Sequence, residues 1–223
     1  MKRIGILFQA DMVRAILAGR KTLTSRLRGL DKLNDGYHRE RINKVQCRDG
    51  LWCFWEIGHG SSSLPVFTAR SPYGQLVGDV LVGRETFYCD DYRYPNIPES
   101  ERTDPDWRQQ MLYYRADGED LCQQIPECDC TETKGCWIPS QLMPYWASRL
   151  RLPVVRVWPS RLQDMDEEMA MQEGVEWEGT AGLARFTAKK LYAELWDRIN
   201  GKKSGRSWAS NPWVWRVQFI GAA

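Results

Sequence analysis

Basic and hydroxyl side chains gather between positions 16 and 28 of the chain. Four cationic residues fall in this stretch: Arg20, Lys21, Arg26 and Arg28. No acidic residue lies between positions 12 and 30. Neighbouring positive charge lowers the pKa of a lysine, which shifts Lys21 toward the neutral amine that can act as a base. Thr24 follows three positions later, and an amine beside a hydroxyl can activate that hydroxyl as a nucleophile. The same pattern also fits a solvated basic loop in which Thr24 only caps a turn.

The elements around this stretch follow from the spacing of apolar residues. Met12, Ile16 and Leu17 form one apolar face, which predicts a short amphipathic helix over 9–18 that Gly19 ends. A second helix is expected between Asp164, which would cap its N-terminus, and Gly174, which would end it. A third is expected over 184–199. Strands are predicted over 2–8, 51–57, 64–69, 152–158 and 213–220, and a turn followed by a strand over 78–83.

Length and charge bound the class of protein. With 223 residues, 43% of them hydrophobic, the chain can bury a substantial core, and we expect one domain over 1–223. Asp11 and Arg14 interrupt the first apolar run, so we expect neither a secretory signal nor a membrane span, and hence a cytoplasmic protein without a membrane partner. Residues 1–50 hold twelve Lys and Arg against five Asp and Glu. This excess suggests an anionic partner such as RNA, DNA or a nucleotide.

The middle of the chain has a different composition. Residues 85–135 hold thirteen acidic against five basic residues, with prolines at 95, 98, 105 and 126. We therefore expect a variable acidic insertion at about 88–136 with sparse regular structure. Short strands with long connections and few helices predict an α+β fold built on a small mixed barrel, with flanking helices and this irregular insertion.

The motif Gly19-x-Lys21-x-x-Thr24-x-Arg26 resembles the signature of the ASCH domain, a small β-barrel family related to PUA domains. Further matches are similar to the longer ASCH proteins of phages and prophages. These are Gly78-Asp79, Trp137-Ile138-Pro139-Ser140, Met143-Pro144 with Trp146-Ala147-Ser148-Arg149, Leu162-Gln163-Asp164 and Asn211-Pro212-Trp213-Val214-Trp215. The resemblance covers the chain outside its variable middle and implies a PUA-like barrel.

The resemblance also implies an activity. Small enzymes of this family remove acyl groups from N4-acetylated cytidine and similar nucleosides, with a lysine as base, a threonine as nucleophile and a glutamate as proton carrier. Lys21 and Thr24 match directly, and Glu173 lies where that glutamate is expected. The end of a helix would raise the pKa of Glu173, which suits a proton carrier, although an ordinary exposed glutamate is the alternative. This hydrolysis of a modified nucleoside requires no cofactor.

Other residues complete the predicted site. Arg84 and Glu85 either line the pocket and bind a base edge or form a local ion pair. The alternative function is a non-catalytic RNA- or DNA-binding module that uses Lys21 and the arginines around it. A third possibility is a protein partner that binds the acidic insertion.

Cysteines and tryptophans offer two further hypotheses. Four cysteines cluster within the insertion: Cys122, Cys128, Cys130 and Cys136. They either bind a structural zinc ion or are reduced thiols in a loop. Most of the eleven tryptophans are expected in the core, including Trp196, Trp213 and Trp215. Trp146 and Trp208 fall in loop-like contexts and are the candidates for pocket walls.

Overall fold

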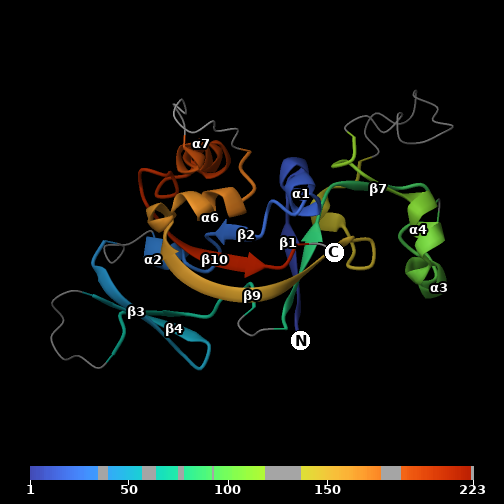
Figure 1. Cartoon of the computed structure of the whole chain (residues 1–223). Helices are drawn as coiled ribbons and strands as arrows, with labels where there is room; N and C mark the ends of the chain where they lie inside the picture. The colour runs from blue at the N-terminus through green and yellow to red at the C-terminus, as the bar shows by residue number, and fades with distance from the viewer. Residues whose placement is uncertain are drawn as a thin grey trace.

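The computed structural model of the chain describes residues 1–34, 40–56, 64–74, 78–91, 93–118, 137–176 and 187–221. It is a mixed α+β structure, as predicted (Figure 1). The strands are β1 Arg3–Leu7, β2 Leu23–Arg26, β3 Ile42–Arg48, β4 Leu51–Glu56, β5 Phe67–Ala69, β6 Val80–Arg84, β7 Phe87–Cys89, β8 Leu112–Tyr114, β9 Leu150–Arg161 and β10 Trp213–Phe219. The α-helices are α1 Ala10–Leu17, α2 Asp31–Asn34, α3 Glu99–Thr103, α4 Pro105–Met111, α6 Glu167–Gln172 and α7 Ala188–Asn200. Short 3₁₀ turns cover Ser140–Leu142 and Leu162–Asp164.

The main sheet has five strands in the order β1-β6-β9-β10-β2. β1 and β6 are parallel, and the other neighbouring strands are antiparallel. α6 and α7 lie side by side over the end of the sheet formed by β10 and β2 (Figure 1). Side chains alternate between the two faces of a strand. In β10, Trp213, Trp215 and Val217 accordingly face the main core, while Val214 packs against α6 and α7.

The two edge strands of this sheet approach each other without pairing. A side-chain hydrogen bond spans the seam, from Arg26 Nη2 to the Leu7 carbonyl oxygen at 2.8 Å. Aromatic packing of Phe8 against Phe219, with ring centroids 6.3 Å apart, fills the space beside the seam. In the described residues β1 and β2 share no backbone ladder, so the sheet is open and the predicted closure of a barrel stays a prediction.

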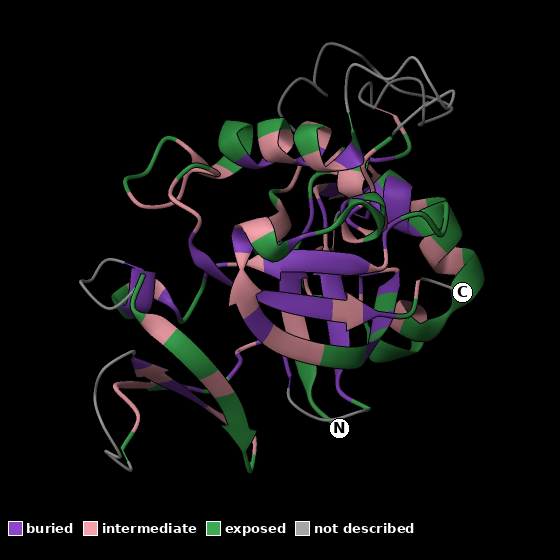
Figure 2. Ribbon diagram, turned by 60° about the vertical axis from the view of Figure 1, so that its left-hand side comes forward, coloured by how far each residue is buried: buried purple, intermediate pink, exposed green. Residues whose placement is uncertain are grey.

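A second, three-stranded sheet has the order β3-β4-β5. Its β3–β4 hairpin extends away from the main sheet, and its outer strand is largely exposed (Figure 2). The other face packs on the main core through Phe54, whose ring meets Trp213 edge-on at 5.4 Å. The predicted strands over 51–57 and 64–69 are therefore confirmed as antiparallel neighbours, with β5 shorter than predicted; residue 57 lies outside the described residues.

The described part of the acidic insertion is more regular than the sequence predicts. It contains α3, α4 and β8, and β8 pairs with β7. The expectation of sparse regular structure is wrong for this part because its scattered apolar residues meet in a separate cluster. Phe87, Cys89, Ile97, Leu112, Met143 and Ala147 form that cluster.

Both helices that flank the candidate site end as predicted. Gly19 follows α1 with a φ of +70°, and Gly174 follows α6 with a φ of +87°, a region that glycine adopts without steric cost. The N-terminus of α6 differs from the prediction, because Asp166 caps Met169 N–H while Asp164 belongs to the preceding 3₁₀ turn. The third predicted helix is present as α7, and residues 184–186 lie outside the described residues.

None of the helices in the described ranges is long and apolar enough to span a bilayer.

Replacing Gly174 by alanine tests how closely α1 and α6 approach. A Cβ there would lie 2.9 Å from the Cβ of Ala15 and 3.0 Å from that of Lys21. We expect Gly174→Ala to lower the free energy of unfolding by about 2–4 kcal/mol, from backbone strain plus overpacking. Gly19→Ala is the matched control, because its φ is also positive but nothing lies within 4 Å of the added atom. It should cost about 1–2 kcal/mol. Equal losses in urea unfolding would contradict the close approach.

Candidate functional site

Lys21 is placed by the end of α1. Two backbone amides, those of Arg20 and Lys21, donate to the Ala15 carbonyl at 2.9 and 3.0 Å, which turns the chain back after the helix. Thr22 N–H then donates to Gln172 O at 2.8 Å, and Lys21 forms an isolated antiparallel bridge with Glu173. The ends of α1 and α6 are therefore joined by backbone contacts, which bring residues 21 and 173 together.

The Lys21 side chain is completely buried and fully hydrogen-bonded. Its Nζ donates to the Leu23 carbonyl at 2.9 Å, to the Glu173 carbonyl at 2.8 Å and to Glu173 Oε2 at 2.7 Å. An ammonium group has three donors, so all of them are used. Lys21 therefore has neither the exposure nor a spare donor for a phosphate of RNA or DNA.

Glu173 is the C-cap residue of α6, and its carboxylate is also buried. Oε2 accepts from Lys21, while Oε1 accepts from the hydroxyls of Ser25 and of Tyr192, the latter at 3.0 Å. The alternative of an ordinary exposed glutamate is therefore wrong. These donors come from the segment after α1, from β2 and from α7, so the carboxylate is a meeting point of separate elements.

Burial and charge set the protonation of this pair. Burial lowers the pKa of Lys21, Glu173 partly restores it, and Arg26 lowers it further. The predicted direction is confirmed, but its main cause is burial. Burial alone would raise the pKa of Glu173, but the charge and hydrogen bond of Lys21, the Ser25 hydroxyl and the charge of Arg216 lower it below the ordinary value. The prediction of a raised pKa is wrong because nearby cations and donors outweigh the effect of burial.

Tyr192 and Arg216 complete the buried cluster. Burial and the charge of Glu173 raise the pKa of Tyr192 well above its ordinary value. The phenol therefore keeps its proton, and its hydroxyl donates a hydrogen bond to Glu173. Arg216 is fully buried in β10, where its Nη1 donates to the Ser25 hydroxyl. The cluster thus holds two cationic side chains, Lys21 and Arg216, against one carboxylate.

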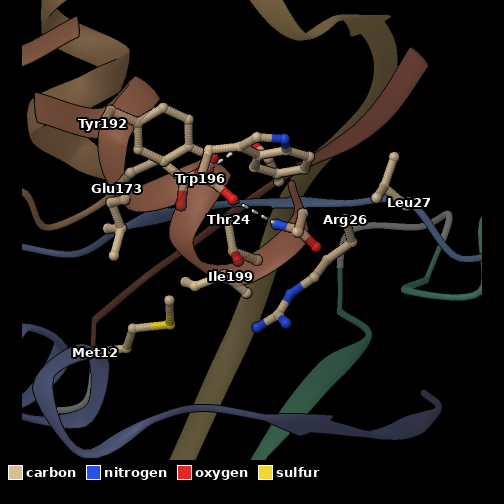
Figure 3. Close-up of a pocket in the computed structure, with 11 residues that line it drawn as sticks. Met12, Thr24, Arg26, Leu27, Glu173, Tyr192, Trp196 and Ile199 are labelled. Carbon is tan, nitrogen blue, oxygen red and sulfur yellow. Dashed lines mark hydrogen bonds between the residues drawn. The ribbon is translucent and has the colours of Figure 1, made fainter. Parts of the chain in front are cut away.

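A small cavity opens beside Glu173, between α1, β2 and α7. Its volume is about 80 Å³, and Thr24, Ser25 and Arg26 of β2 line it together with Glu173. Figure 3 shows Tyr192 and Trp196 of α7 on one side of this space and Met12 on another. A water molecule occupies about 30 Å³ of liquid, so this inner cavity suits a small group such as a short acyl chain.

A larger outer cavity of about 680 Å³ adjoins the inner one. Both are lined by Met12, Glu173 and Leu195, so Glu173 lies where they meet. Charged side chains line the outer cavity: Asp11, Arg14, Arg20, Glu176, Glu194 and Arg198. Its volume lies within the range typical of sites for small organic molecules.

Thr24 lies in β2 and lines the inner cavity, but the sequence argument for its contact with Lys21 does not hold. All three Lys21 donors point elsewhere, and no hydrogen bond joins the two side chains in the described residues. The physical reason is that the segment is extended rather than a tight loop. Successive side chains of β2 point to opposite faces, which directs Ser25 toward Glu173 and Thr24 away from Lys21.

The predicted arginines occupy different positions. Arg20 pairs with Glu176 at 2.9 Å on the wall of the outer cavity. Arg26 lines the inner cavity and lies 5.2 Å from the centre of the Phe8 ring, with its buried Nε unpartnered. Arg28 is exposed.

Four residues predicted to line the site lie on neither of these cavity walls: Arg84, Glu85, Trp146 and Trp208. Arg84 contacts the Tyr145 ring at 4.7 Å, and Glu85 binds Arg149 through two hydrogen bonds of 2.9 and 3.1 Å. Trp146 packs in the aromatic cluster of the insertion, 6.1 Å from Trp107. The ring of Trp208 packs against that of Tyr192, with centroids 6.2 Å apart, and Trp208 lines a separate hollow.

The core tryptophans are confirmed as buried: Trp196, Trp213 and Trp215. The four cysteines of the suggested zinc site lie outside the described residues, so that site stays a prediction. Within the described residues, no group of three or more metal-ligating side chains gathers.

Sequence reasoning missed Ser25, Tyr192 and Arg216. Arg216 carried a signal, because a charge within the apolar strand Trp213–Phe219 must find partners when that strand is buried. Tyr192 falls within the helix predicted over 184–199, but its contact with Glu173 depends on how α7 packs on α6.

Comparisons of the chain with protein-family models, curated proteins and solved structures give no match.

Removing the Lys21 charge tests the buried ion pair. We expect Lys21→Met to lower the free energy of unfolding by about 3–5 kcal/mol, because an unpaired carboxylate remains in the interior. The double variant Lys21→Met, Glu173→Gln should recover part of this loss, since it removes that carboxylate. Chemical denaturation of the wild type, both single variants and the double variant measures the coupling. Additive losses would show that the two side chains do not interact.

The lowered pKa of Glu173 also predicts a pH dependence of stability. A carboxyl whose pKa is depressed in the folded state stabilises the fold above its ordinary value of 4.5, and this contribution is lost as pH falls through the folded-state pKa. The difference in unfolding free energy between wild type and Glu173→Gln should therefore shrink as the pH is lowered from 6 to about 3. A difference that stays constant over this range would contradict the prediction.

Proposed function

We propose that this chain is a PUA-like ASCH protein that hydrolyses the amide of an N4-acylated cytosine nucleoside. The observation that carries the proposal is the buried contact between Lys21 and Glu173, at 2.7 Å, beside a cavity that Thr24 lines. Residues so far apart in the chain have no need of a shared buried charge for stability alone, since apolar pairs often stabilise a core as well or better. The mixed five-stranded sheet, whose edge strands Arg26 bridges, supports the PUA-like assignment.

The two cavities suggest how such a substrate would be oriented. The acyl group fits the inner cavity, next to Thr24, and the cytosine with its sugar fits the larger outer cavity. The scissile carbon–nitrogen bond then lies near Glu173, which both cavities share. This placement gives the carboxyl access to the departing exocyclic nitrogen.

The proposed reaction is a nucleophilic substitution at the acyl carbon. Lys21 first passes a proton to Glu173 along their hydrogen bond, which gives a neutral amine and a neutral acid. Lys21 Nζ then exchanges its bond to the Leu23 carbonyl for one to Thr24 and takes the hydroxyl proton as the Thr24 oxygen attacks. The carbon–nitrogen bond breaks as Glu173 gives its proton to the amine, and water releases the acyl group from Thr24.

The charges around the cavity favour this chemistry. Attack on the amide carbonyl creates a negative oxygen, and fixed positive groups stabilise it in a site that excludes water. Arg26 lines the inner cavity, and Lys21 and Arg216 outnumber the single carboxylate of Glu173 in the buried cluster. The site therefore offers the positive potential that the transition state requires.

A panel of N4-acylated cytidines with acyl groups of increasing length tests the proposal. We expect release of cytidine by the wild type, with loss of at least about a hundredfold in Thr24→Val, Lys21→Met and Glu173→Gln, as for removal of a nucleophile or general base. Chromatographic detection of cytidine measures turnover. Thr22→Val is the matched control, since this half-buried threonine lies on neither cavity wall. Absence of turnover on every member, with folded wild type, would overturn the proposed activity.

A further inference from the structure

We propose that Ser25 and Arg216 are positioning residues that hold Glu173 by its Oε1 edge and favour its carboxylate form before substrate binds. The importance of this arrangement for catalysis rests on the proposed function, but the arrangement itself rests on contacts in the structure. Lys21 occupies the other carboxylate oxygen, so Glu173 is held from two sides by two different cations, one directly and one through a hydroxyl.

The sheet register explains why Ser25 and Arg216 meet. They are directly opposite each other in the antiparallel pair of β2 and β10. Side chains at such positions lie on the same face and close together. That face carries α6 and α7, so the pair points toward Glu173 at the end of α6. The Ser25 hydroxyl accepts from Arg216 Nη1 and donates to Glu173 Oε1, which makes it a link between the two charges.

The guanidinium of Arg216 is fixed on its remaining edges. Nε donates to the Ser160 hydroxyl at 3.1 Å, and Nη2 donates to the Leu162 carbonyl at 2.7 Å. A planar guanidinium held in this way cannot rotate away from Ser25 without leaving buried donors unpaired. Arg216 is therefore a rigid anchor, and Ser25 transmits its position and charge to the carboxylate.

Among the described residues, the groups that donate to the Glu173 carboxylate, directly or through a hydroxyl, favour its charged form. Lys21 donates from the segment after α1, Ser25 from β2 and Tyr192 from α7, while Arg216 of β10 acts through Ser25. Loss of the Ser25 hydroxyl would remove one donor and break the link to Arg216. Glu173 would then take up a proton at higher pH, and its Oε1 edge would be held by Tyr192 alone.

Carbon-13 NMR of protein labelled at the glutamate side-chain carboxyls tests this without turnover. The Glu173 signal is assigned by its loss in Glu173→Gln and followed against pH. We expect the Glu173 titration to move to higher pH in Ser25→Ala and to return toward the wild type in Ser25→Thr, which restores a hydroxyl. Ser148→Ala is the control, because Ser148 is also buried but donates to the Gly83 carbonyl of β6, away from Glu173. It should leave the titration unchanged.

The outcomes separate this proposal from the proposed activity. Where cytidine release is measured, Ser25→Ala should lower kcat and shift the acidic limb of its pH profile in the same direction as the NMR titration. A Glu173 titration in Ser25→Ala that coincides with the wild type overturns the positioning role, whatever the activity. A shifted titration in a protein that hydrolyses no acylcytidine upholds the positioning role and removes the proposed activity. Arg216→Lys provides a second variant, and it should also shift the titration, since lysine cannot reach Ser25, Ser160 and Leu162 together.

Discussion

The buried ion pair of Lys21 and Glu173 is the constraint on which the rest of the structure depends. Removing two charges from water carries a large desolvation cost, which is offset only when their remaining hydrogen-bonding groups are satisfied. Here Leu23 and the Glu173 carbonyl satisfy Lys21, while Ser25 and Tyr192 satisfy Glu173. These partners come from β2, from the end of α6 and from α7. The ends of α1 and α6, strand β2 and helix α7 must therefore all be in place for the pair to be tolerated.

Arg216 extends this constraint into the sheet. A second buried cation next to an ion pair leaves the cluster with an excess of positive charge, and the carbonyls of Leu162 and Leu23 only partly compensate it. An excess of this kind is unfavourable for folding but favourable for binding a group that develops negative charge. Stability and the proposed chemistry thus make opposite demands on the same residues, as is expected of an active site.

The sequence predicts the elements of this fold better than their contacts. The helix before Gly19, the helix before Gly174 and most of the strands follow from local periodicity, which depends on neighbouring residues only. The contact of Lys21 with Glu173 could be anticipated only through the family resemblance, because 152 positions separate them in the chain. Ser25 could not be assigned, since its role depends on the register that places it opposite Arg216. The pKa of Glu173 is predicted in the wrong direction because the helix end can be read from local sequence, whereas the cations and donors that lower the pKa come together only by tertiary packing.

The position of β2 at the edge of the sheet explains why a cavity exists here. A strand paired on both sides has its backbone groups covered, and a second neighbour would occupy the space that the inner cavity takes. Other contacts flank this edge instead. Lys21 and Thr22, just before β2, contact Glu173 and Gln172, and Arg26 at the end of β2 reaches across to Leu7. Thr24, Ser25 and Arg26 line the cavity. Arg26 thus links the edge strands β2 and β1 through a side-chain hydrogen bond rather than a backbone ladder, and the same side chain lines the inner cavity.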